Sequence, residues 1–124
     1  MSKKILVADD EPNIVISLEY LFKREGYTVL VARDGQEALN SITREKPDLV
    51  LLDVMMPIKT GLEVLQAVRA SDALRLTKIL MLTAKGRDTD ITKGLALGAD
   101  AYMTKPFSTR ELVDKVAAML AGSP

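Results

Sequence analysis

The chain has 124 residues, of which 48% are hydrophobic, and this size and composition suit one compact domain with its own core. It carries 17 basic and 17 acidic residues, so no net charge directs it toward nucleic acid or an anionic membrane. Neither cysteine nor histidine occurs, which excludes disulfides, thiolate or imidazole catalysis and histidine-ligated zinc. Chemistry must therefore rely on oxygen groups, namely carboxylates, hydroxyls and backbone carbonyls, together with a hard cation.

The first part of the chain alternates short apolar runs with segments of helical periodicity. A strand over residues 5–8 ends in Asp9-Asp10-Glu11, and a helix then begins at Pro12 and is stopped by Gly26. Residues 27–32 are rich in β-branched side chains and predict a second strand. A second helix, marked by Ala38, Leu39 and Ile42, ends before Pro47.

The central stretch, residues 48–57, is an apolar run that places the carboxylate of Asp53 at its end. A run without a polar face predicts a strand that is covered on both sides, as in the middle of a parallel sheet. Pro57 prevents further strand pairing, and Lys59-Thr60-Gly61 is predicted to be a loop. We therefore expect Asp53 to open into a crevice at the edge of the sheet.

The last part of the chain repeats this alternation. The spacing of Leu62, Leu65 and Val68 predicts a third helix. Residues 78–83 predict a buried strand that ends in the hydroxyl of Thr83. Residues 101–104 predict a fifth strand, which Lys105-Pro106 follows. The segment from Asp88 to Leu97 is a poor helix former and should be the least firmly held helix. Ser108 or Thr109 is predicted to cap a last helix, and residues 122–124 are predicted to be a tail.

Five strands that alternate with five helices predict an α/β fold, a doubly wound parallel sheet between two layers of helices. No repeat, linker or low-complexity tract interrupts the alternation, so we expect residues 1–124 to form a single domain. The N-terminal segment is too short for a signal peptide and no run reaches membrane-spanning length. We therefore expect a cytoplasmic protein that binds neither membrane nor nucleic acid directly.

Polar groups recur at the strand ends, which is where ligands bind in folds of this kind. They are the carboxylates of Asp9, Asp10 and Asp53, the hydroxyl of Thr83 and the ammonium of Lys105. Carboxylates packed together raise each other's pKa unless a cation intervenes, and oxygen-only ligands favour Mg²⁺, with Mn²⁺ as an alternative. Each residue also has a structural explanation: Asp9 and Asp10 as helix caps, Asp53 and Thr83 as strand-end groups bonded locally, and Lys105 as a solvated cation.

The chain resembles the receiver domains of two-component response regulators, the CheY-like domains. The resemblance runs from Lys4 to about Leu120 and rests on motifs in a fixed order: Val7-Ala8-Asp9-Asp10-Glu11, Leu52-Asp53-Val54-Met55-Met56-Pro57, Gly61, Leu82-Thr83-Ala84, Gly98-Ala99-Asp100-Ala101-Tyr102 and Lys105-Pro106-Phe107. It implies a flavodoxin-like sheet of strand order 2-1-3-4-5. It also implies a phosphoprotein that promotes its own modification rather than a turnover enzyme.

The resemblance assigns roles to the site residues. Asp53 would accept a phosphoryl group from the phosphohistidine of a sensor histidine kinase or phosphotransfer protein. Asp10, Asp53 and the backbone carbonyl of Met55 would hold Mg²⁺, with Asp9 acting directly or through water, while Lys105 would neutralise phosphoryl charge. The Lys105–Pro106 peptide bond is cis in the family.

The resemblance also implies a switch. The phosphoryl group would draw in Thr83 and the loop that starts at Ala84, and Tyr102 would turn inward and so change the surface of the fourth helix, fifth strand and fifth helix. That surface would bind a downstream partner. Met55 and Lys85 are poorly suited to orient an attacking water, so we expect a phosphorylated state that lasts hours rather than seconds.

The Gly98–Phe107 segment resembles the branch whose members carry winged-helix DNA-binding domains and dimerise through the fourth and fifth helices. Ala101 and Lys115 replace residues common at that dimer face, so a homodimer is an open question. The alternatives for this chain are the receiver part of a longer transcriptional regulator and a non-phosphorylated interaction module. A dehalogenase-like phosphatase would need an acid where Met55 stands, and a flavodoxin-like cofactor binder would not place Asp9-Asp10-Glu11 in its phosphate loop.

Overall fold

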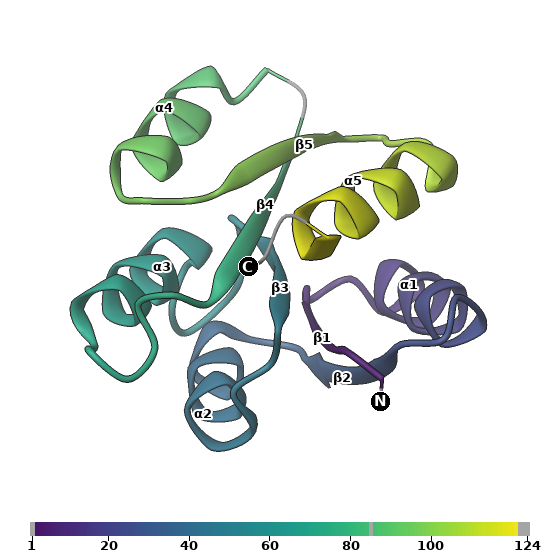
Figure 1. The fold of residues 1–124 in the computed structure, drawn as a ribbon. Helices are drawn as coiled ribbons and strands as arrows, with labels where there is room; N and C mark the ends of the chain where they lie inside the picture. Colours follow the sequence, from purple (N-terminus) through teal and green to yellow (C-terminus); the bar gives the residue numbers. More distant parts are fainter. Residues whose placement is uncertain (1, 85, 122–124) are drawn as a thin grey trace.

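One sheet of parallel strands organises the computed structural model, which describes residues 2–84 and 86–121 (Figure 1). The strands are β1 (Lys4–Ala8), β2 (Thr28–Ala32), β3 (Leu49–Asp53), β4 (Lys78–Ala84) and β5 (Ala101–Lys105). They lie in the order β2-β1-β3-β4-β5, and every pairing is parallel. The predicted strands and their order are confirmed. β3 is shorter than the apolar run 48–57 and ends at Asp53, and each of the other four strands differs from its predicted bounds by one residue at one end. Such a difference is the usual uncertainty of a strand boundary.

Helices cover both faces of the sheet, as the sequence predicts. They are α1 (Pro12–Arg24), α2 (Gly35–Glu45), α3 (Gly61–Ala70), α4 (Asp88–Ala96) and α5 (Thr109–Ala121). Figure 1 shows α1 and α5 on one face and α2, α3 and α4 on the other. The fold is therefore the doubly wound three-layer sandwich expected from the alternation of strands and helices.

Alternate residues of the central strands pack into two separate hydrophobic cores, one on each face of the sheet. Leu51 of β3 packs toward α1 and α5, whereas Val50 and Leu52 pack toward α2 and α3. All five residues of β3 are buried, because helices cover both of its faces. This explains the continuous apolar run in the sequence and makes β3 a rigid support for the residue at its end.

The segment between β3 and α3 corrects one prediction. Lys59-Thr60-Gly61 was expected to be a loop, but Thr60 is the N-cap of α3 and Gly61 its first residue. The Thr60 hydroxyl accepts a hydrogen bond from the Glu63 amide, and the Glu63 carboxylate accepts one from the Thr60 amide. This reciprocal capping box starts the helix earlier than its apolar spacing indicates.

Helix α4 buries only Gly94, whereas α1, α2 and α3 each bury four residues. The Ile91 side chain is partly covered and Leu95 is 46% exposed. Little apolar area therefore holds α4 against the sheet, in keeping with the prediction that it is the least firmly held helix. The predicted tail, residues 122–124, lies outside the described residues.

Candidate functional site

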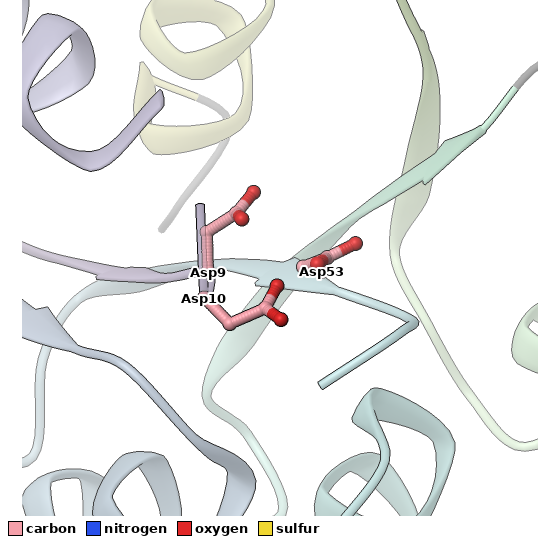
Figure 2. A group of neighbouring side chains, drawn as sticks. All are labelled: Asp9, Asp10 and Asp53. Atoms are coloured by element: carbon pink, nitrogen blue, oxygen red, sulfur yellow. The ribbon is translucent and has the colours of Figure 1, made fainter. Parts of the chain in front are cut away.

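The strand pairing brings Asp9 and Asp53 to the same edge of the sheet. Ala8 pairs with Leu52, so the residues that follow, Asp9 and Asp53, occupy equivalent positions at the ends of β1 and β3. Figure 2 shows the carboxylates of Asp9, Asp10 and Asp53 gathered at these two strand ends. A carboxylate oxygen of each residue lies within 4.8 Å of the others. The predicted acid cluster is therefore present.

Burial and mutual repulsion shape the electrostatics of this cluster. Asp9 is fully buried and Asp53 is 5% exposed, whereas Asp10 is exposed. Burial, followed by the negative charge of Asp9, raises the pKa of Asp53 to about 7, although the nearby Lys105 ammonium opposes the rise. Without added positive charge, Asp53 is therefore only about half ionised near neutral pH.

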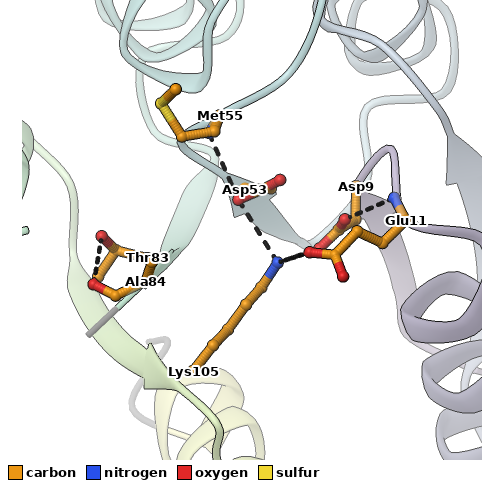
Figure 3. Close-up of polar contacts among 7 residues, drawn as sticks. All are labelled: Asp9, Glu11, Asp53, Met55, Thr83, Ala84 and Lys105. Carbon is orange, nitrogen blue, oxygen red and sulfur yellow. Dashed lines mark hydrogen bonds and ion pairs between the residues drawn. The ribbon is translucent and has the colours of Figure 1, made fainter.

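Lys105 reaches this cluster from the end of β5 (Figure 3). Its ammonium lies 2.8 Å from an Asp9 oxygen, 3.2 Å from a Glu11 oxygen and 3.6 Å from an Asp53 oxygen. Burial alone would lower the pKa of Lys105, but the hydrogen bond to Asp9 and the charge of Asp53 raise it above its usual value. Lys105 is therefore a desolvated cation directed at the acids and not a solvated loop residue.

Glu11 is the contact that the sequence reading did not assign to the site. It belongs to the Asp9-Asp10-Glu11 run at the end of β1, and that run of acids was the available signal. Glu11 is also the N-cap residue of α1, and its own side chain makes no capping hydrogen bond. Neither Asp9 nor Asp10 is therefore the N-cap. One Asp9 oxygen nevertheless accepts a hydrogen bond from the Glu11 amide over 2.9 Å, so Asp9 has a local structural role at the start of α1 besides its contact with Lys105.

The loop after β3 wraps closely around Asp53. The Met55 amide donates to an Asp53 carboxylate oxygen over 3.4 Å, and the Gly61 amide donates to the Val54 carbonyl over 2.8 Å. A Cβ added to Gly61 would lie 2.2 Å from the Asp53 carbonyl oxygen, so only glycine permits this approach. The loop thereby brings the Met55 backbone beside the acid cluster, while the Met55 side chain is 53% exposed.

Of the expected switch residues, Thr83 lies on β4, the strand next to Asp53, whereas Tyr102 lies on β5, one strand farther away. Thr83 is 1% exposed, and its hydroxyl donates to the Ala84 carbonyl over 3.5 Å, which is long for a hydrogen bond. In Figure 3 this hydroxyl points away from Asp53. Tyr102 on β5 is 44% exposed, and Lys85 lies outside the described residues. The Lys105–Pro106 peptide bond is cis, as the family resemblance implied.

The donor set decides which kind of ion could occupy this edge. Within residues 2–84 and 86–121, Asp9, Asp10 and Asp53 are the group of acids close enough to share a metal ion. All of the donors are oxygens, which suits a hard divalent cation. Positive charge here would also relieve the repulsion that raises the pKa of Asp53. The residues therefore fit a metal site.

Comparisons with known proteins agree with the fold and show the family. Residues 5–117 match the family model of the response regulator receiver domain. The alkaline phosphatase synthesis transcriptional regulatory protein PhoP of Bacillus subtilis is 52% identical over 123 residues, which are 99% of this chain and 50% of that protein. The chain thus spans about half the length of this relative.

Solved structures of response regulators have the same fold as this chain. The Francisella response regulator 1452 receiver domain superposes with a TM-score of 0.88 at 34% identity, over 97% of this chain and 98% of that one. The chemotaxis response regulator CheY4 of Vibrio cholerae superposes with a TM-score of 0.89 at 33% identity, over 95% and 98% of the two chains. In the described part of the chain, no helix is long and apolar enough to cross a bilayer. The chain belongs to the receiver domains of two-component response regulators.

Proposed function

We propose that Asp53 accepts a phosphoryl group from a phosphohistidine on a sensor histidine kinase or phosphotransfer protein. A carboxylate oxygen of Asp53 forms the new bond to phosphorus as the bond to the imidazole nitrogen breaks, which gives an acyl phosphate. The observation that carries this proposal is the gathering of three carboxylates within 4.8 Å of one another, with the Lys105 ammonium 3.6 Å from Asp53. The chain is modified once in this reaction and does not turn over a substrate.

Asp10, Asp53 and the backbone carbonyl of Met55 would hold Mg²⁺ or Mn²⁺, with Asp9 acting directly or through a coordinated water. The bound ion would neutralise charge on the phosphoryl oxygens and keep the Asp53 carboxylate ionised near neutral pH. The support comes from the oxygen-only donor set and from the raised pKa of Asp53. Asp9 and Asp53 are buried where β1 and β3 end, so both carboxyl groups already lie at the site.

Lys105 stabilises the transferred group through its positive charge. Phosphoryl transfer needs alignment and charge neutralisation more than covalent assistance from the protein. The Lys105 ammonium, which contacts Asp9 and Glu11, is within a short movement of a phosphoryl group on Asp53. An ammonium has three donors, so Lys105 can bind a phosphoryl oxygen and retain an acidic partner.

Phosphorylation then switches the face formed by α4, β5 and α5. A phosphoryl oxygen is a stronger acceptor for the Thr83 hydroxyl than its present 3.5 Å contact with the Ala84 carbonyl. Movement of Thr83 and Ala84 toward Asp53 makes room for Tyr102 to turn inward, because Thr83 and Tyr102 line one crevice. The weak packing of α4 allows this helix to respond.

The switched face binds a downstream protein or an output domain of the same polypeptide. The similarity to a transcriptional regulatory protein of twice the length supports a place in such a regulator. Sedimentation of the modified protein tests whether the phosphorylated chain forms a homodimer. We place this signalling in the cytoplasm, where the phosphodonor kinase domain acts.

The first test is incubation with acetyl phosphate and Mg²⁺, followed by intact mass. The native chain should gain one phosphoryl group, and Asp53→Asn should gain none. Asp34→Asn is a matched control, because Asp34 follows β2 at the same sheet edge but caps α2, a role that asparagine fills equally well. An unmodified native chain, or a modified Asp53→Asn chain, would refute the assignment.

The role of Lys105 has its own test. Lys105→Met retains much of the side-chain length but removes the charge, so phosphorylation by acetyl phosphate should slow by about 100-fold, by analogy with the loss of one charge-stabilising donor. The rate is followed by intact mass over time, and far-UV circular dichroism verifies the fold. A rate within about twofold of the native one would contradict the role, because it would mean that almost no transition-state stabilisation was lost.

A further inference from the structure

A narrow crevice lies between α4 and the strands beneath it. Thr83, Asp90 and Tyr102 line it, and its other walls are apolar side chains such as Val54, Met81 and Ile91. Thr83 comes from β4, Tyr102 from β5 and Asp90 from the first turn of α4. The crevice therefore joins three elements, two of which carry the residues of the proposed switch.

The proposed function gives no role to Asp90, the carboxylate residue that lines this crevice. Its side chain is 13% exposed, which is unusually low for a carboxylate on a surface helix. The Nε atom of Arg87, the N-cap residue of α4, donates to its Oδ2 atom. Because this pairing uses Oδ2, the second oxygen, Oδ1, can accept another hydrogen bond.

An inward turn of Tyr102 creates a demand for such an acceptor. Its side chain is 44% exposed at present, so water can reach it. Inside an apolar crevice the hydroxyl would lose water, and a buried hydroxyl without a partner is unfavourable. The side-chain acceptors that line the crevice are Thr83 and Asp90. In the phosphorylated form Thr83 has moved toward Asp53 and away from the crevice, which leaves the carboxylate of Asp90.

We propose that Asp90 is a positioning residue of the switch, whose carboxylate accepts a hydrogen bond from the Tyr102 hydroxyl in the phosphorylated form. This inference rests on the proposed function and goes beyond it by naming the group that holds the inward tyrosine. A bond from Tyr102 to Asp90 ties β5 to the first turn of α4. It therefore gives a direct route by which the state of Asp53 reaches the weakly packed helix α4.

Tyrosine fluorescence tests this contact. The chain has three tyrosines and no tryptophan, so Tyr20→Phe together with Tyr27→Phe leaves Tyr102 as the sole emitter. The reporter protein is treated with acetyl phosphate and Mg²⁺, and intact mass establishes its phosphorylation. Iodide quenching measures whether Tyr102 turns inward. Emission intensity measures the acceptor, because a hydrogen bond to a carboxylate quenches phenol emission.

On phosphorylation, the reporter protein should lose iodide access and also lose emission intensity. In an Asp90→Ala reporter the loss of intensity should disappear, and in Asp90→Glu it should return in part. Asp88→Ala is the matched control, because Asp88 is also in the first turn of α4 but is exposed and outside the crevice. Arg87→Gln removes the ion pair while it retains the carboxylate, so it should preserve the loss of intensity.

The outcomes separate the two proposals. Unchanged iodide access in the phosphorylated reporter would show that Tyr102 stays outside, which overturns the switch and the inference together. A second outcome is that iodide access is lost and the Asp90→Ala reporter loses as much emission intensity as the reporter that retains Asp90. The switch would then stand, but another acceptor, such as a backbone carbonyl, would hold Tyr102. A chain that remains unphosphorylated by mass overturns the proposed function itself and this inference with it.

Discussion

The crowding of acids at the sheet edge predicts that the phosphoacceptor destabilises the metal-free fold. Asp53→Asn removes the carboxylate but retains its shape and polarity. The pKa of Asp53 is about 7 in the folded chain and the ordinary value is 3.8. Because the folded state binds the proton more tightly than the unfolded state, native stability falls as pH rises from about 4 to about 7. The asparagine variant has no such fall.

The size of the effect follows from the pKa difference. A rise of roughly three units corresponds to about 4 kcal/mol at 1.36 kcal/mol per unit. Water that reaches the exposed Asp10 side of the cluster screens part of this interaction, so we expect a gain of about 2 to 4 kcal/mol for Asp53→Asn at pH 8. Near pH 4 the native carboxyl is protonated, and the gain should be close to zero.

Urea denaturation followed by far-UV circular dichroism measures this difference at pH 4, 6 and 8 in the presence of EDTA. Asp34→Asn, at the exposed cap of α2, controls for the general effect of an amide. Adding Mg²⁺ at pH 8 should stabilise the native chain more than Asp53→Asn, because an ion that binds only the folded state stabilises it by mass action.

The reasoning would be refuted if Asp53→Asn changed the free energy of unfolding by the same amount at pH 4 and pH 8 in EDTA. That result would mean that the folded environment does not disfavour the Asp53 carboxylate. A gain that persists undiminished at saturating Mg²⁺ would separately show that the cation does not use the Asp53 carboxylate.

Three further predictions concern the backbone and the far end of the sheet. Ile58 is β-branched with φ 71°, so Ile58→Gly should raise stability by about 1 kcal/mol after the entropy of glycine is subtracted, and an unchanged urea midpoint would contradict this strain. Gly61→Ala should lower stability by about 2 kcal/mol or more and slow phosphorylation by acetyl phosphate, because the alanine Cβ would overlap the Asp53 carbonyl. A native rate of phosphorylation would exclude the overlap. Arg69 donates to three backbone carbonyls and to Asp100, so Arg69→Met should lower stability by about 2 to 4 kcal/mol, and a loss of less than about 0.5 kcal/mol in urea denaturation would count against the network.

Local sequence patterns were enough for the elements and for most of the site. The apolar run before Asp53 predicted a strand covered on both faces, and all of β3 is buried. Because parallel strands end at one edge, the acids after β1 and β3 and the lysine after β5 could be placed together before any coordinates. The start of α3 was missed, because the capping box of Thr60 and Glu63 lies ahead of the apolar spacing that marks the helix.

Contacts that depend on side-chain direction were beyond the sequence. Neither the Glu11 contact with Lys105 nor the shared crevice of Asp90 and Tyr102 follows from spacing, because each depends on the direction in which the side chains point. The direction of the Thr83 hydroxyl, which bonds the Ala84 carbonyl and points away from Asp53, is likewise a property of the packed structure.

By itself the sequence determined the order of strands and helices along the chain and the chemical types of the side chains at the strand ends, since these depend on periodicity and on residues close in the chain. Tertiary structure alone decided which oxygens lie near the Lys105 ammonium and how far burial raises the pKa of Asp53. The reason is physical: distances between distant residues and the exclusion of water arise only when the strands pair and the helices cover them.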